Sequence, residues 1–265
     1  RNPVNNPIKD TLVQYHWTSE LTLADGVVPA RRPANELDFA LEVPFGFKPP
    51  GPELGPVAVV IHCFYPEELK SILDLLHNIP LPADLFLSTD APTKRDAIAA
   101  LTSDWPKGTV EIRVLENRGR DIAPKFIGFR DIYARYELFL HLHTKKSLHG
   151  GAALARWRDH LLANLIGTPA VVRSVLHLFR DPRMGIVFPQ HLFEIRGILN
   201  WGYDYDHARK LMQRIGVEIS KDLTLEFPSG SMFWGRTAAI RPLLECGLAY
   251  EEFPDEAGQI DGLEE

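Results

Sequence analysis

Strand-like and helix-like hydrophobic patterns alternate along most of this chain. The continuous β-branched run at residues 57–61 is typical of a buried parallel strand, and residues 66–78 then carry apolar side chains at helical spacing. The same order recurs three times, with strands predicted at 83–88, 110–115 and 138–143 and helices predicted at 94–101 and 123–136. This alternation predicts an α/β fold with a mostly parallel, doubly wound sheet and right-handed crossovers.

The two ends of the chain differ from this central pattern. Residues 1–55 are rich in Pro, Asn and Gly and show one alternating stretch, so we predict a linker with short strands there and a domain over residues 56–265. The later part of the domain is predicted to contain helices at 152–166, 170–179, 207–215 and 237–246, a strand at 184–188 and an irregular aromatic region at 190–205.

Composition narrows the class of protein. With 45% apolar and 24% charged residues among 265, the chain has the proportions of a globular protein whose core needs no disulfide or structural metal. The two cysteines, Cys63 and Cys246, have neither CxxC nor zinc-ligand spacing, which favours a reducing compartment. The net charge of -6 argues against nucleic acid as the main partner. We also expect no transmembrane segment in this piece, because the sequence has no run of about 18 apolar residues.

The first residue is Arg1 rather than Met, so we expect a segment of a longer protein with other domains, and an acidic end that continues past residue 265. Familiar nucleotide and hydrolase motifs are missing from the sequence. It contains no G-x-G-x-x-G, no P-loop, no H-E-x-x-H and no G-x-S-x-G, and Pro228 stands where a serine elbow needs Gly.

Ligands of open parallel sheets bind outside the carboxyl ends of the strands. Polar residues follow four predicted strands, at 62–65, 88–90, 117–121 and 141–147. The densest of these segments is Asn117-Arg118-Gly119-Arg120-Asp121, in which Gly119 can adopt a positive φ and fold the turn back. The alternative is that Asp121 caps the next helix and the arginines are solvated. We expect Asp121 to cap the helix in any case, but capping does not explain two arginines, so we favour a ligand site.

His141 and His143 lie two residues apart on a strand, so their side chains share a face and the intervening leucines take the other. Two imidazoles on one face could bind a metal, but hydrogen-bonded histidines at the end of the sheet are the favoured interpretation. The adjacent polar residues could hold a diphosphate or, alternatively, be solvated; these are Thr144, Lys145, Lys146 and Ser147.

Two further groups supply candidates for sugar binding and for catalysis. Aromatic rings could stack on sugars or instead pack in the core. The candidates for acceptor or sugar binding are Trp201, Tyr203, Ser229, Gly230, Ser231 and Trp234. The acidic end could supply a catalytic carboxylate or be solvated surface, and its candidates are Asp255, Glu256 and Asp261.

The segments at 117–124, 141–147 and 227–234 together resemble the rhamnan synthesis protein F family. The likeness extends over residues 57–262 and keeps the three motifs in order. The resemblance implies a role in bacterial rhamnose-containing polysaccharides or lipopolysaccharide O-antigens. It also implies a cytoplasmic location, with the inner face of the bacterial inner membrane as a narrower alternative.

More distantly, the same order is similar to family-2 type glycosyltransferases with a GT-A fold, which is the nucleotide-diphospho-sugar transferase type. Asn117-Arg118-Gly119 matches the turn of those enzymes, residues 230–234 resemble a later Gly-rich segment, and Asp255-Glu256 or Asp261 would stand near their acidic pair with the catalytic base. The departure lies at 141–143, where His-Leu-His replaces the metal-binding DxD. The resemblance therefore does not imply a carboxylate-bound Mg²⁺ or Mn²⁺.

Transfer from a nucleotide sugar expels a diphosphate, whose growing charge must meet a metal or fixed cations. Arg118, Arg120 and the lysine pair 145–146 would supply four cations from two neighbouring strand ends. We therefore expect no cofactor, with a divalent ion (Mg²⁺ or Mn²⁺) as the other option. The full predicted donor set is Asn117, Arg118, Gly119, Arg120, Asp121, His141, His143, Thr144, Lys145, Lys146 and Ser147.

The predicted function is a glycosyltransferase that moves rhamnose from a dTDP-rhamnose type donor to a polysaccharide or lipid-linked glycan acceptor. Two alternatives stay open. The first is a carbohydrate-binding or scaffolding domain without turnover, and the second is a histidine-ligated metal hydrolase.

Overall fold

The computed structural model describes residues 54–144, 151–196, 199–202, 204–222 and 225–253. Within these ranges the chain forms a six-stranded sheet with the order β3-β2-β1-β4-β6-β5. The strands are β1 (Val57–His62), β2 (Ala83–Thr89), β3 (Val110–Val114), β4 (Leu138–His143), β5 (Ile186–Val187) and β6 (Phe233–Arg236). The first four strands pair in parallel, whereas β6 is antiparallel to both β4 and β5. The predicted α/β class and mostly parallel sheet are confirmed.

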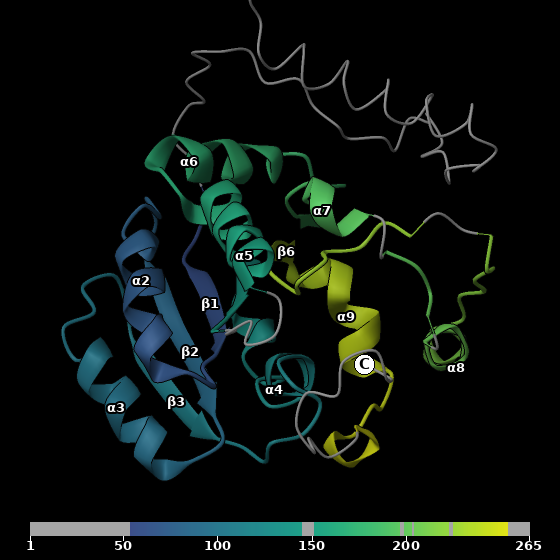
Figure 1. Cartoon of the computed structure of the whole chain (residues 1–265), viewed down its shortest axis with the longest axis horizontal. Coiled ribbons are helices and arrows are strands. Elements are labelled where there is room, and N and C mark those ends of the chain that lie inside the picture. Colours follow the sequence, from purple (N-terminus) through teal and green to yellow (C-terminus); the bar gives the residue numbers. More distant parts are fainter. Residues whose placement is uncertain (1–53, 145–150, 197–198, 203, 223–224, 254–265) are drawn as a thin grey trace, which may run out of the picture.

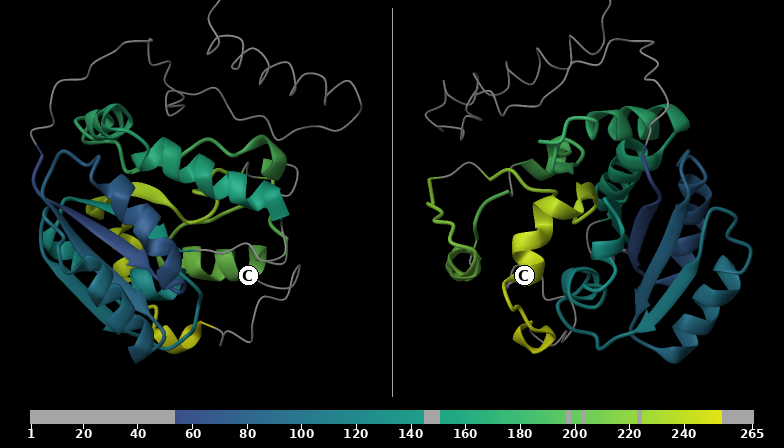
Figure 2. Two further views of the ribbon diagram at one scale, coloured as in Figure 1. Left: turned by 60° about the vertical axis from the view of Figure 1, so that its left-hand side comes forward. Right: turned by 180° about the vertical axis from the view of Figure 1, so that it is seen from behind.

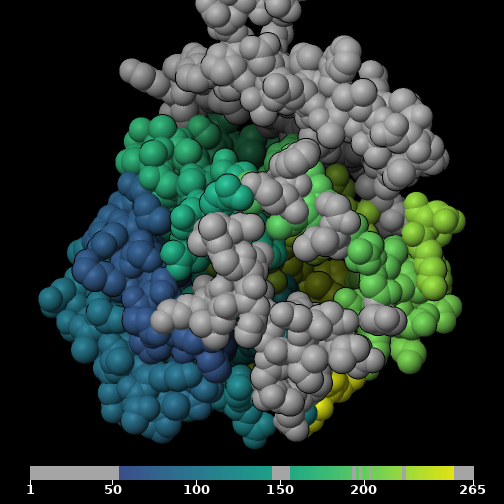
Figure 3. Space-filling view, viewed as in Figure 1, coloured from purple at the N-terminus to yellow at the C-terminus, as the bar shows by residue number. Residues whose placement is uncertain are grey.

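Helices lie on both sides of the sheet (Figures 1 and 2). They are α2 (Pro66–Leu76), α3 (Pro92–Thr102), α4 (Ile122–Phe126), α5 (Gly151–Ile166), α6 (Pro169–Leu178), α7 (Phe193–Arg196), α8 (Tyr205–Arg214) and α9 (Thr237–Glu245), with short 3-10 turns at Tyr133–Arg135 and Tyr250–Glu252. Figure 3 shows one face, on which the olive atoms of β6 and α9 lie deeper than the green atoms of α5 and α7.

Alternation along the strands divides the core into two layers. Val57, Val59 and Ile61 face α2, α3, α5 and α6, whereas Ala58 and Val60 face the side covered by α9 and the chain between α4 and β4. All six residues of β1 are buried, as a strand covered on both faces requires. The three leucines of β4 pack in the first layer and Phe139 packs in the second, which confirms the predicted division of its two faces.

The order of the strands places a topological switch beside β1. From β1 the chain adds β2 and then β3 on one side, and it returns to place β4 on the other side. In open α/β sheets such a reversal leaves a crevice outside the carboxyl ends of the two flanking strands. The carboxyl ends of β1 and β4, at His62 and His143, are therefore the expected ligand-binding edge.

Several elements differ from the predicted ones, including the short helix α7 inside the region 190–205 that was expected to be irregular. The helix predicted at 123–136 ends at Phe126, because the Gly128 N–H donates to the Ala123 carbonyl, five residues back, and so leaves the four-residue pattern of an α-helix. The strand predicted at 184–188 is shortened to Ile186–Val187. Strand β6 was not predicted, because its four residues include a glycine and lead directly into α9.

Within the described residues, no single helix is long and apolar enough to cross a membrane. The pair Arg156–Ile166 and Pro169–Leu178 reaches the required length and composition together, with a bend of 68° between the two helices. Much of the apolar surface of this pair belongs to the core of the sheet. The predicted linker at 1–55 lies almost wholly outside the described residues, so the division at residue 55 stays a prediction.

Candidate functional site

Three segments that are far apart in the sequence meet at the carboxyl ends of β1 and β4. His143, the last residue of β4, bonds through Nε2 to the Gly230 carbonyl at 2.6 Å. Lys125 of α4 donates to the Ser231 carbonyl at 2.8 Å and forms an ion pair with Asp121 at 2.6 Å. The turn at 117–121, the end of β4 and the turn at 229–231 are thus joined by direct contacts.

The route by which these segments meet differs from the predicted one. We expected the cations after β3 and those after β4 to come from neighbouring strand ends, but β2 and β1 lie between these two strands. The chain after β3 instead returns toward β1, where Asp121 is close enough to His62 and His143 to change their electrostatic environment. The expectation of neighbouring strands is wrong, although the two motifs do meet.

The turn at 117–121 has a left-handed backbone. Gly119 has φ 63° and Arg120 has φ 49°, which confirms the positive φ expected of Gly119. The Gly119 carbonyl accepts from the N–H groups of Ile122 and Ala123, so the turn leads directly into α4. Asp121 occupies the N-cap position but makes no side-chain capping bond, and its carboxylate pairs with Lys125 instead. The capping alternative for Asp121 is therefore wrong.

Arg118 binds the described C-terminal end of the chain. Its guanidinium donates to the carbonyls of Phe253, at 2.7 Å, and Glu251, at 3.3 Å. The Tyr250 hydroxyl donates to the Glu116 carbonyl at 2.9 Å, so the same two segments are joined twice. A side chain held in this way shapes the turn, and Arg120, half-buried beside it, is the second cation of the same turn. Asn117 is exposed.

His62 is a buried polar residue of the site that the sequence-based candidate set did not include. Its Nδ1 lies 3.0 Å from the Ser88 hydroxyl of β2, and 7% of its surface is exposed. Burial lowers the pKa of His62 to about 4, with further lowering from His143 and Lys125 and an opposing effect of Asp121. The ring is therefore neutral at pH 7. Its position directly after a buried apolar strand was the sequence signal for it.

The two histidines of β4 are hydrogen-bonded rather than arranged around a metal. His141 Nε2 lies 2.5 Å from the Tyr133 hydroxyl, and burial lowers the pKa of His141 well below its usual value. His143 contacts Gly230 as described above. In the part of the chain that the structure describes, no group of three or more His, Cys, Asp or Glu side chains could hold a metal ion. These residues thus give the histidine-ligated hydrolase no support.

Lys125 was missed as well. Its side chain is fully buried, and burial lowers its pKa while Asp121 raises it again. Burial alone would raise the pKa of Asp121, but Lys125, followed by His143, holds it well below its usual value. The Asp121 carboxylate is therefore ionised at pH 7, and it lies within ion-pair distance of Lys125. The sequence signal was the spacing of four residues between Asp121 and Lys125, which places them on one helix face.

The predicted sugar-binding residues lie in different environments. Trp234 is fully buried and its indole N–H donates to the Leu165 carbonyl at 3.1 Å, so it belongs to the core and its ring cannot stack on a sugar. Ser229 is buried, with its hydroxyl 2.9 Å from His191. Trp201 is half-buried and packs edge-on against Tyr205. Tyr205 belongs to α8, which is not one of the three joined segments.

Thr144 is the last described residue of the fourth-strand motif. Its N–H donates to the His62 carbonyl at 3.0 Å, and its hydroxyl accepts from the Tyr65 N–H at 2.9 Å, so it closes the end of β4 onto β1. The other candidates in this and the later segments lie outside the described residues. They are Lys145, Lys146, Ser147, Tyr203, Asp255, Glu256 and Asp261.

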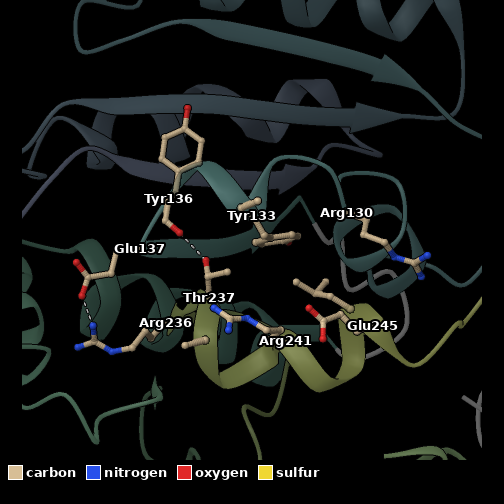
Figure 4. Close-up of a pocket in the computed structure, with 11 residues that line it drawn as sticks. Arg130, Tyr133, Tyr136, Glu137, Arg236, Thr237, Arg241 and Glu245 are labelled. Atoms are coloured by element: carbon tan, nitrogen blue, oxygen red, sulfur yellow. Dashed lines mark hydrogen bonds and ion pairs between the residues drawn. The ribbon is translucent and has the colours of Figure 1, made fainter.

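Two cavities lie between described elements. The larger, of about 570 Å³, lies at the amino-terminal end of β4, between the 3-10 turn at Tyr133–Arg135 and α9, where Arg236 pairs with Glu137 (Figure 4). The smaller, of about 300 Å³, lies next to the 117–121 turn and is lined by Ile122, Phe126 and Phe253 among others. The joined motifs lie at the opposite end of β4 from the larger cavity, so we place the candidate site at the motifs.

Comparison with known proteins points to one family. A family model described as rhamnan synthesis protein F matches residues 52–263. The chain is also 35% identical over 207 residues to proteins named "Uncharacterized protein WxcX" from two strains of Xanthomonas campestris pathovar campestris. Those matches cover 77% of this chain but 29% of each relative, so the chain spans less than a third of the length of these curated relatives.

Proposed function

The chain belongs to the rhamnan synthesis protein F family, which places it in polysaccharide synthesis, and we propose that its α/β domain is a glycosyltransferase of the GT-A-like type. The observation that carries the proposal is the meeting of the three motifs at the topological switch of the sheet. Doubly wound sheets bind nucleotides in this crevice. The link to polysaccharide synthesis comes from the family, and the geometry supports a site for a nucleotide-sugar donor.

In the proposed reaction an acceptor hydroxyl oxygen attacks the anomeric carbon of the donor sugar. The bond from that carbon to the diphosphate oxygen breaks, and its electron pair leaves with the nucleoside diphosphate. The hydroxyl proton passes to a carboxylate, for which Asp255, Glu256 and Asp261 are the candidates. Fixed cations in a water-poor crevice lower the barrier by meeting the charge that develops on the diphosphate.

We assign this role to Arg120, which is half-buried in the left-handed turn at 117–121, with Lys145 and Lys146 as further candidates. Arg118 acts indirectly, because its donors hold the C-terminal segment against the turn. Neutral His62 and Ser88 provide hydrogen-bonding groups at the same edge without adding charge. We propose a dTDP-rhamnose type donor and a polysaccharide or lipid-linked glycan acceptor on the family description alone, and a location on the cytoplasmic side of the bacterial inner membrane.

Titration of the purified protein with dTDP, with and without EDTA, tests the donor site. We expect saturable binding that EDTA leaves unchanged, because the joined segments offer cations and no DxD. Binding that vanishes with EDTA and returns with Mn²⁺ would contradict metal-free binding. Donor-dependent release of free nucleoside diphosphate then separates transfer from binding alone.

Replacement of Arg120 by Ala provides a residue-level test. Loss of a charge-assisted contact to phosphate costs about 1.5–3 kcal/mol, so we expect roughly 10- to 100-fold weaker dTDP binding. Arg183→Ala is the matched control, because Arg183 is exposed and pairs with Asp181 away from the motifs. Equal affinities in the two variants would remove Arg120 from the site.

A binding domain without turnover is the second candidate. The observation that favours it is the pairing of Asp121, the carboxylate of the joined motifs, with Lys125. A carboxylate whose pKa is held low by an ammonium group is a weak base. Binding of dTDP-rhamnose without release of dTDP, in the presence of acceptor glycan, would favour this candidate.

A further inference from the structure

Lys125 is the described residue that contacts two of the three motifs through one buried group. Its ammonium group lies 2.6 Å from Asp121 Oδ2 and donates to the Ser231 carbonyl at 2.8 Å, and none of its surface is exposed. Its own carbonyl accepts from the Tyr133 hydroxyl, which in turn contacts His141. The side chain and backbone of Lys125 thus link α4 to the second core layer.

Each of the two turns that Lys125 joins has an unfavourable backbone. Gly119 and Arg120 have φ of 63° and 49°, and Gly230 and Ser231 have φ of 78° and 54°. A left-handed conformation is costly for a residue with a side chain, and such residues persist only where surrounding contacts hold them. The contacts of Lys125 are made at the residue after Arg120 and at Ser231 itself.

Stability alone does not account for a charged pair at this position. A buried ion pair is generally no more stabilising than apolar side chains of the same shape, because both ions lose their hydration. The pair does have an effect on an anion site: without Lys125, the carboxylate of Asp121 would repel a diphosphate bound at the same turn. Through its bond to the Ser231 carbonyl, Lys125 also links two turns that lie more than 100 residues apart in the sequence.

We propose that Lys125 is a positioning residue, which joins the turn at 119–121 to the turn at 230–231 and neutralises Asp121, so that the crevice accepts a diphosphate. The second half of this inference rests on the proposed function. The first half, the joining of the turns, is a property of the folded chain and can be measured without any ligand.

Lys125→Met tests both halves, because Met keeps the length of the side chain and removes its charge. Hydrogen–deuterium exchange is measured in peptides covering 117–123 and 228–233, with 57–62 of β1 as the internal reference. We expect exchange at least tenfold faster in both turns, unchanged exchange in β1, and dTDP affinity at least tenfold weaker. Lys107→Met is the matched control: its ammonium group also donates to a backbone carbonyl, that of Ile79 at 2.5 Å, at the other end of the sheet. We expect it to change neither readout.

Lys125→Met leaves a buried carboxylate unpaired and can fail to fold, so the double variant Lys125→Met/Asp121→Asn is measured in parallel. Having no unpaired charge, it should fold while still exchanging rapidly in both turns. A folded Lys125 variant whose turns exchange as slowly as those of the wild type, and which binds dTDP equally well, would overturn the inference. If the wild type itself does not bind dTDP, the proposed donor site fails, and exchange in the two turns alone decides the joining role.

Discussion

The most informative single residue for stability is His62, at the carboxyl end of β1. Its pKa is about 4 in the folded chain against an ordinary value of 6.5, because burial disfavours the charged ring. Between these two values the unfolded chain takes up a proton that the folded chain does not. The unfolding free energy should therefore fall as the pH is lowered from about 6.5 to 4.

We expect this residue to contribute a loss of about 3 kcal/mol between pH 7 and pH 4, at about 1.4 kcal/mol per pKa unit. Urea unfolding at pH 7 and pH 4 gives the loss of unfolding free energy for the wild type and for His62→Gln. The difference between these two losses is the contribution of His62. His207→Gln, at an exposed position of α8, should keep the pH dependence of the wild type. An unchanged dependence in His62→Gln would show that the ring is accessible to protons in the folded state.

Several residues of the site could be predicted from their type and their position in the sequence. Gly119 was expected to adopt a positive φ and does, and His141 and His143 share a face as their spacing required. Lys125 was not predicted, because a lysine in the first turns of a helix is usually solvated and its burial depends on a turn more than 100 residues later. Trp234 was assigned to sugar binding because the sequence alone does not distinguish an aromatic residue of the core from one that stacks on a sugar.

At the scale of elements, β6 depends on a glycine. A Cβ at Gly235 would lie 2.3 Å from the ring of Phe139 on β4, the strand with which β6 pairs. Gly235 therefore leaves room for the ring of Phe139, which packs in the second core layer. A glycine in a strand interior commonly marks such a close approach.

Gly235→Ala should lower the unfolding free energy by about 1–3 kcal/mol, because the added methyl group overpacks this layer. Guanidinium-induced unfolding followed by tryptophan fluorescence measures it, since Trp234 is adjacent and buried. The control is Gly55→Ala, where an added Cβ meets nothing within 4 Å and the unfolding free energy should change by less than about 0.5 kcal/mol. If both variants have the same stability, Phe139 can move aside.

Element prediction succeeded where hydrophobic periodicity was strong and failed where a tertiary contact ended an element. Strands β1 and β4 and helices α2 and α5 agree with their predicted ranges to within about two residues. The helix predicted at 123–136 continued through Gly128 because its apolar pattern continues there. The Gly128 carbonyl instead accepts a hydrogen bond from Arg113 of β3, a tertiary contact that no local pattern contains.

At the scale of the whole molecule, two segments more than 100 residues apart meet at the candidate site. Residues 116–130 hold the segment 248–253 through Arg118, Arg130 and Tyr250. A Cβ on Gly119 would lie 2.6 Å from the ring of Phe253, so the two segments also pack closely against each other. A ligand that orders the turn at 117–121 should therefore also order 248–253.

We expect saturating dTDP to slow amide exchange in peptides covering 117–121 and 248–253 together, with the same dependence on dTDP concentration. Among the described residues no backbone hydrogen bond joins helix α3, at 92–102, to 248–253, so α3 serves as the unaffected reference. Slower exchange at 117–121 with no change at 248–253 would show that the Arg118 contacts do not couple the two segments.

The sequence by itself determined the α/β class, the order of the first four strands along the chain, and three polar motifs at strand ends, because periodicity and turn chemistry are local properties. Only the tertiary structure decided which motifs meet. Strand order separates β3 from β4 by two strands, yet the turn after β3 returns to β1, and a buried lysine joins it to a turn more than 100 residues away. Such contacts depend on which faces of the sheet are covered and on the burial of individual charges, and neither is encoded in any short stretch of residues.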